Sequence, residues 1–167
     1  MSDIYTLQFE GLVTVHRAID AALQSVVDAS TSPLDVIVPA TRGAAGFLLA
    51  HHGAEDNVLF PALRRAGRLR STDVSALEAR DREHHDLHEL CDRLLGAAAR
   101  TAPAAAYIAA LAAETRDRLR AHVAEEEHTL AADRLREMMT PADLADLNRQ
   151  LEDFRARAPQ RPAQIAR

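Results

Sequence analysis

The feature that most constrains the fold of this chain is a set of polar pairs spaced four residues apart within apolar stripes. The pairs are His51/Glu55, His84/His88 and His122/Glu126. Residues i and i+4 differ by about 40° around a helix axis, so both members of a pair share one face. Because their neighbours on that face are apolar, the pairs point into a protein interior. The chain is therefore expected to form a helical bundle with polar groups inside it.

Four long segments carry this helical pattern. The first, over about residues 5–29, places Leu12, His16 and Ile19 on one stripe, at the alternating steps of three and four that favour an amphipathic helix. The second is expected to reach residue 66, the third to run over 71–99, and the fourth to open at 101–103. Composition agrees, because glycine is scarce at six residues and aromatics make up only 4%, which disfavours a β-sheet core.

Turn and capping residues separate the segments at short intervals. Gly67 is expected to end the second helix, residues 71–73 to cap the third, and Pro39 and Pro61 to kink the second. Short connections between long helices imply antiparallel neighbours. We therefore predict an all-α fold: an antiparallel up-down-up-down four-helix bundle with a short extra C-terminal helix from residue 140. The predicted bundle domain covers residues 1–157, and residues 158–167 are expected to be a flexible C-terminal tail.

Charge and cysteine content exclude several classes of partner. The net charge is −5 and the basic residues, all arginine, are scattered, so no nucleic-acid surface is predicted. Cys91 is the only cysteine, so no disulfide forms within the chain. The longest apolar run is too short to span a bilayer, and the start lacks a secretory signal, so the expected location is the cytoplasm with no membrane partner.

A weak internal repeat divides the chain into two helical hairpins. The segment His51-x-x-x-Glu55-Asp56-x-x-Leu59 recurs 71 residues later, starting at His122, with Glu127 in the place of Asp56. The helices upstream of the two copies carry His16 and His84 at corresponding positions, and Asp20 corresponds to His88. A two-metal site with unequal ligand sets follows from this difference.

The predicted interior holds more donors than a single zinc ion needs. The donors are five imidazoles and two carboxylates, from His16, His51, Glu55, His84, His88, His122 and Glu126. Buried without a partner these groups are costly, and a metal removes that cost. Seven donors exceed one tetrahedral zinc and suit two ions that share carboxylates, and mixed imidazole and carboxylate ligation suits iron. A ferritin-like site needs paired Glu-x-x-His motifs, and only Glu125/His128 fits, so that alternative is set aside.

Four stretches, in order, resemble the hemerythrin-like (HHE cation-binding domain) family over about residues 8–135. They are residues 15–19 (VHRAI), 51–61 (HHGAEDNVLFP), 83–88 (EHHDLH) and 122–127 (HVAEEE). The resemblance implies two non-haem iron ions (Fe2+/Fe3+), bridged by an oxo or hydroxo group.

The resemblance also implies a division of the ligands. One iron takes the three histidines His84, His88 and His122, the other takes His16 and His51, and Glu55 and Glu126 bridge them. Hemerythrins proper place an Asp five residues after the histidine of the fourth helix, where this chain has Glu127. We prefer Glu126 on helical geometry and keep Glu127 as its substitute.

The remaining polar residues are expected to play supporting roles. We expect His52, His85 and His128 to face solvent or to support the ligands from outside, and Asp20 and Asp56 to orient ligand histidines by accepting their second N–H. Two further expectations concern residues near the ligands: Glu125 and Glu127 belong to a solvated charged face, and Cys91 is a small core residue. No catalytic acid is assigned, and Asp56, His52 and Tyr107 are the candidates for one.

Three functions remain open at this point. The first is redox chemistry on O2, hydrogen peroxide or NO, including catalase-like peroxide dismutation, at an iron with an open position. The second is a non-enzymatic protein that binds or senses O2, NO or iron. The third is a structural bundle without metal. In each case we expect a monomer or homodimer.

Overall fold

The computed structural model describes residues 3–157, and these form helices connected by short turns, with no strand among them. The elements, in chain order, are α1 (Ile4–Asp28), α2 (Leu34–Ala54), η1 (Glu55–Leu59, a π-helical turn), α3 (Phe60–Ala66), α4 (Ser71–Ala98), α5 (Ala105–Thr129), α6 (Ala132–Met138) and α7 (Pro141–Arg157). The predicted helices over the first, third and fourth segments are confirmed to within a few residues. The predicted tail over residues 158–167 lies outside the described residues.

Local side-chain chemistry explains where the helices begin and end. The carboxylate of Asp3 accepts hydrogen bonds from the backbone N–H of Tyr5 and Thr6 at 2.9 and 3.2 Å, so it caps the start of α1. Gly67 ends α3 with φ 68°, a left-handed conformation that glycine adopts without a steric penalty. The start of α4 differs from the expectation, because Arg70 is the capping residue and Asp73 accepts its backbone N–H at 2.8 Å.

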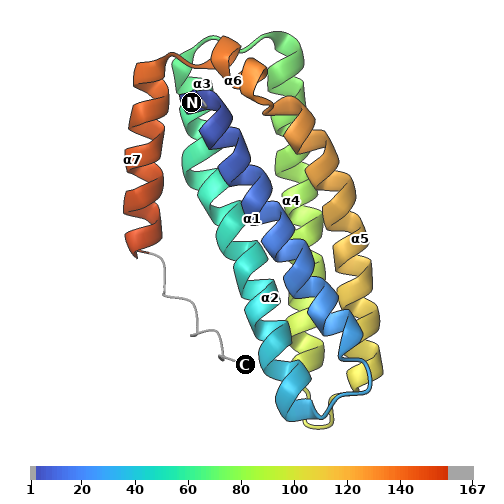
Figure 1. The fold of residues 1–167 in the computed structure, drawn as a ribbon. Helices are drawn as coiled ribbons and strands as arrows, with labels where there is room; N and C mark the ends of the chain where they lie inside the picture. Colours follow the sequence, from blue (N-terminus) through green and yellow to red (C-terminus); the bar gives the residue numbers. More distant parts are fainter. Residues whose placement is uncertain (1–2, 158–167) are drawn as a thin grey trace.

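The long helices pack lengthwise against one another as a helical bundle (Figure 1). In this bundle α1 packs against α2 and α5, and α4 also packs against α2 and α5. The buried core has two apolar clusters. One contains Ile19, Leu48, Leu87 and Leu119, and the other, nearer α6 and α7, contains residues such as Leu63, Leu77, Leu130, Leu144 and Leu147. The chain thus leaves a gap in its apolar core between these clusters.

The second helix is continuous where the sequence predicted kinks. Helix α2 runs through Pro39 without a break, and α2, η1 and α3 follow one another directly. Pro61 has no backbone N–H and therefore cannot donate the hydrogen bond to Asn57 that an α-helix needs. The chain takes a π-helical turn over the preceding residues, in which the N–H of Phe60 donates to the carbonyl of Glu55, five residues back. Such turns are frequent at functional sites.

The C-terminal part contains one helix that was predicted and one that was not. Helix α7 is the predicted short extra helix, and it packs its apolar side, including Leu144, Leu147 and Leu151, against the rest of the molecule. Helix α6 was missed because seven residues are too few to display a periodic stripe; Leu135 and Met138 bury it against α1. Within residues 3–157, none of the helices combines the length and the apolar character that a bilayer crossing needs.

Candidate metal centre

The polar groups singled out in the sequence form one layer between the two apolar clusters. Each of the long helices contributes a histidine to this layer. The residues are His16 on α1, His51 on α2, His84 on α4 and His122 on α5, together with Glu55 on η1 and Glu126 on α5. All but His51 have at most 2% of their surface exposed. The helical periodicity that keeps the flanking positions apolar therefore brings these side chains to one place in the interior.

The donors fall into two groups whose ligand atoms lie close enough to hold a cation. The three-histidine group consists of His52, His84 and His122, and the mixed group consists of His16, His51, Glu55 and Glu126. Within each group the ligand atoms all lie within 4.8 Å of one another. The two groups are adjacent, because the rings of His51 and His52 lie 5.7 Å apart on consecutive residues of α2. The layer thus offers two neighbouring cation positions.

Two carboxylates connect these groups. Glu55 has Oε1 3.1 Å from Nε2 of His51 and Oε2 3.5 Å from Nε2 of His84, so each oxygen faces a different group. Glu126 has Oε2 3.2 Å from Nε2 of His16 and 3.5 Å from Nε2 of His122. Each of the two carboxylates therefore contacts a histidine of both groups.

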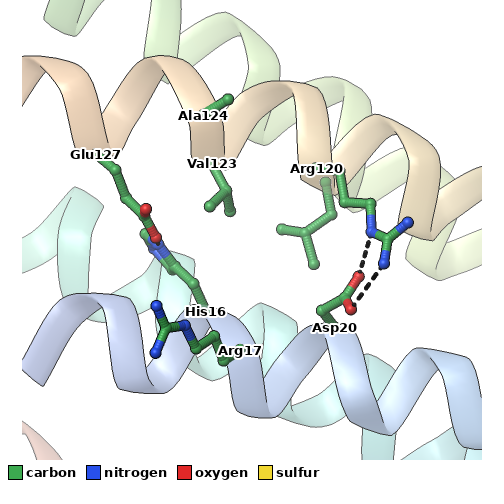
Figure 2. A pocket seen from close by; sticks show the side chains of 8 residues that line it. His16, Arg17, Asp20, Arg120, Val123, Ala124 and Glu127 are labelled. Atoms are coloured by element: carbon green, nitrogen blue, oxygen red, sulfur yellow. Dashed lines mark hydrogen bonds and ion pairs between the residues drawn. The ribbon is translucent and has the colours of Figure 1, made fainter.

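Carboxylates on the outer side orient three of the histidine rings. The Nδ1 atoms of His16, His84 and His122 lie 2.9, 2.7 and 2.8 Å from oxygens of Glu127, Asp56 and Glu83, respectively. Figure 2 shows Glu127 reaching from α5 to the ring of His16 on α1. A carboxylate can only accept a hydrogen bond, so Nδ1 of each ring donates and Nε2 is turned toward the centre. A histidine held in this orientation presents Nε2 to the interior, where a metal could bind it.

Buried polar atoms without a hydrogen bond are concentrated in this layer. Within the described residues, all such side-chain atoms except Nε of Arg80 and Arg116 belong to the histidines and glutamates of the two groups or to His88 beside them, and they include both oxygens of Glu55 and of Glu126. An unsatisfied buried polar group costs about 1–3 kcal/mol, so a cluster of them needs a common partner. Inward-facing imidazole and carboxylate atoms are the donors that iron and similar cations bind, so the residues present fit a pair of such ions.

The pKa shifts of two histidines in this layer also fit a metal site. Burial, and the charges of His16, His84 and His122, lower the pKa of His51 to about 3, and burial beside other histidines also lowers the pKa of His52. Both rings are therefore neutral at physiological pH, as a metal ligand must be.

The two bridging carboxylates are shifted in opposite directions. Burial and the negative charges of Glu126 and Asp56 raise the pKa of Glu55 well above its usual range. Burial acts in the same sense on Glu126, but the neighbouring His122 and His16 outweigh it and hold the pKa of Glu126 well below that range. A cation between them would compensate the repulsion that Glu55 experiences.

One of the two donor groups contains a residue outside the predicted ligand set. The three-histidine group contains His52, which is fully buried, where the prediction had His88. His88 is only half-buried and lies beside the group, with its ring centroid 5.3 Å from that of His52. Of the two positions expected for His52, facing solvent or supporting the ligands, the structure excludes the first. The expectation for His52 assumed that only one narrow stripe of the helix faces the interior. The interior is wide enough here for the consecutive residues His51 and His52 each to face a different group.

Several supporting residues also have partners that the sequence did not show. Asp56 accepts from His84 as expected, but Asp20 instead pairs with Arg116 and Arg120, the latter visible in Figure 2. Glu127 is not part of a solvated face, because it contacts His16. Glu83 was missed altogether. Its signal in the sequence was its place directly before a ligand histidine, but a single acidic residue at that place is too common to identify it.

The other expected positions agree with the structure. His85 and His128 are exposed, and so is Glu125. Cys91 is buried in the core, and burial raises the pKa of its thiol to about 12, so it is not a reactive thiolate at neutral pH. Tyr107 is 49% exposed and lies outside both ligand groups.

The helical bundle and its buried histidine and glutamate layer define a class of protein, namely cation-binding helical bundles. Within that class, residues 8–133 match the family described as the hemerythrin HHE cation binding domain. The match covers most of the chain, so the chain belongs to this family, which confirms the resemblance seen in the sequence. The comparison with curated proteins found no match, and neither did the comparison with solved structures.

Proposed function

We propose that this chain is a non-haem di-iron protein that handles a small oxygen species, with catalase-like dismutation of hydrogen peroxide as its activity. O2 and NO are the other ligands of the right size and chemistry. In this assignment one ion is held by His52, His84 and His122 and the other by His16 and His51, and the ions share Glu55 and Glu126. The partner is thus a diatomic or peroxide molecule.

The observation that carries the proposal is the position of Glu55. Its two oxygens face His51 and His84, which belong to different ligand groups, at 3.1 and 3.5 Å. A carboxylate with one oxygen facing each group can contact an ion in both groups at once. Its position therefore favours two neighbouring ions over a single ion or none. The buried, unpaired oxygens of Glu126 support the same arrangement from the opposite side.

The two groups differ in how they can meet a substrate. The three-histidine group is buried, whereas the mixed group has two histidines and reaches the surface through His51, which lines a groove beside α7. Iron supplies electron transfer to and from a small oxygen species. The residues of this chain supply the rest: His51 and Glu55 form the wall of the open position, and Glu127, Asp56 and Glu83 hold the ligand rings in orientation.

The proposal includes three features of the whole molecule. The long helices follow one another in antiparallel, up-down-up-down order, which their short connections support. The chain works as a monomer or homodimer, without nucleic acid or membrane. Its expected location is the cytoplasm.

The test combines metal content with gas release. The protein loaded with ferrous iron under anaerobic conditions is expected to bind two ions per chain and to release O2 from hydrogen peroxide. His51→Ala is expected to abolish release, because it removes a ligand at the open position. His85→Ala is the matched control, since that histidine is exposed and pairs only with Glu89. An iron-loaded sample that leaves peroxide unchanged would exclude the catalase-like activity, and a chain that takes up no metal would exclude the site.

The alternative is a non-enzymatic protein that binds or senses O2, NO or iron. The groove at His51 supports this alternative equally well, because a ligand that enters through it can bind without being converted to a product. An absorbance change that persists on adding O2, without consumption of peroxide, supports binding. Rapid return to the ferric spectrum with peroxide consumption supports the enzyme.

A further inference from the structure

A groove of about 720 Å³ runs along the surface between α1, α2 and α7 and ends at the metal centre. His51 and Glu55 of the mixed group belong to its lining. The three-histidine group contributes no residue to it. The groove therefore connects the surface with one of the two proposed ion positions and not with the other.

The groove is far larger than a diatomic molecule or hydrogen peroxide needs. A water molecule occupies about 30 Å³ of liquid, and sites for organic ligands measure about 300–1,000 Å³. The volume of 720 Å³ lies in the second range. Passage of a small oxygen species alone does not account for a groove of this size.

The lining combines apolar walls with a few polar side chains. Leu12 and Val15 of α1, Ala54 of α2 and Leu151 and Phe154 of α7 are among its apolar residues. Besides His51 and Glu55, its polar residues are Gln8, Asn148, Glu152 and Arg155, of which the last two are exposed. A ligand that matches this pattern has an apolar body and places one polar, oxygen-bearing end against His51 and Glu55.

Helix α7 makes the groove and does not belong to the shared family domain. The family match ends at residue 133, whereas α7 covers Pro141–Arg157. In Figure 1, α7 stands beside the continuous segment formed by α2, η1 and α3, on one side of the bundle. Its Phe154 approaches α2 so closely that a Cβ atom on Gly53 would lie 3.6 Å from the ring. This chain therefore adds a wall to the family's centre directly beside the ligand segment.

We infer that the groove binds a small apolar organic molecule with one polar oxygen end, in the manner of an alkyl or aryl hydroperoxide or its alcohol. This inference rests on the proposed function, since it names the substrate class of the same centre. The apolar body lies between α1, α2 and α7, and the oxygen end reaches His51 and Glu55.

The test measures binding directly, by calorimetry on the full chain with 2-phenyl-2-propanol as the probe. Two mid-helix glycines allow a matched comparison, because both are exposed and a Cβ at either meets no atom within 4 Å. Gly11 lines the groove and Gly46 does not. Gly11→Phe fills the groove and is expected to raise the dissociation constant of the probe at least about tenfold, whereas Gly46→Phe leaves it unchanged. Ala50→Phe, a second filling variant, is expected to act like Gly11→Phe.

The possible results separate this inference from the proposed function, because metal content is measured in the same samples. Two ions per chain without probe binding, or equal binding by Gly11→Phe and Gly46→Phe, would overturn the groove inference alone. Probe binding without metal uptake would support the groove and contradict the di-iron function. Dimers that are lost only in the filling variants would assign the groove to a second copy of the chain and overturn the inference.

Discussion

The two helical hairpins of the bundle contribute similar but unequal halves to the centre. The first hairpin is α1 with α2 and η1, and the second is α4 with α5. Corresponding residues in the repeat occupy corresponding places: His16 and His84, His51 and His122, Glu55 and Glu126, and Asp56 and Glu127. The outer acids cross over between the hairpins, because Asp56 holds His84 and Glu127 holds His16.

Besides Asp20 and His88, the halves differ at two places that bear on the two donor groups. His52 of the first hairpin corresponds to Val123 of the second, and Glu83 of the second corresponds to Val15 of the first. His52 joins His84 and His122, and Glu83 orients His122. Val15 instead lines the groove at His51. The three-histidine group thus gains a nitrogen donor and a supporting carboxylate, while the mixed group gains an apolar approach. One group is therefore closed and the other lies at the groove.

The largest effect is expected from the carboxylate that joins the halves. Glu126→Ala should lower metal affinity by more than the roughly 10–100-fold that the loss of a supporting residue costs, because Glu126 faces both groups. Glu127→Ala, the adjacent control, should lie within that smaller range, since it contacts only the outer nitrogen of His16. Metal titration of both variants measures this. Equal losses would mean that the two acids share one role.

A second substitution makes the two halves alike. His52→Val copies the residue of the second hairpin and removes a donor from the three-histidine group, so the chain should retain about one ion instead of two. His88→Val should retain both ions, because His88 lies outside either group. Metal analysis after desalting distinguishes the two variants. Loss of an ion from His88→Val alone would restore the ligand set that the family resemblance implied.

A smaller effect is expected from the carboxylate behind His122. Glu83→Gln should weaken metal binding about 10–100-fold, because a neutral amide supports the ring less strongly than a carboxylate held by Arg80 at 2.9 Å. Glu89→Gln is the control, an exposed acid on the same helix. Competition with a chelator of known affinity measures the difference. If both variants bind metal as the unmodified chain does, the outer carboxylates do not contribute to affinity.

The smallest effect concerns the stability of the iron-free protein. The pKa of His51 falls from 6.5 to about 3 on folding, so below pH 6.5 the unfolded chain takes up a proton that the folded chain does not. Stability from this group is therefore present above pH 6.5 and is lost as the pH falls toward 3. Between pH 7.5 and 5.5 the iron-free chain should lose about 1–1.5 kcal/mol more than iron-free His51→Gln does. Denaturant unfolding at the two pH values measures it, and equal losses would show that burial does not exclude the proton.

Much of the fold could be predicted from the sequence, and so could the presence of six of the seven candidate ligands in the two donor groups, because both depend on helical periodicity. His16 lies between Leu12 and Ile19 at helical steps, and His84 and His122 each have a leucine three residues away, so the pattern favours the interior for all three, where the structure buries them. The π-helical turn could not be predicted in the same way. It depends both on Pro61 and on the packing of η1 against α7, which is far away along the chain.

The sequence by itself determined that helices form, where most of them end, and that histidines and glutamates share an interior, because these features are local and repeat every three to four residues. Only the tertiary structure decided which neighbour each donor meets. The selection of His52 over His88, the crossing of Asp56 and Glu127 between hairpins, and the groove beneath α7 depend on distances between helices far apart in the chain. No periodicity along one helix contains those distances, since they arise from the packing of all the helices at once.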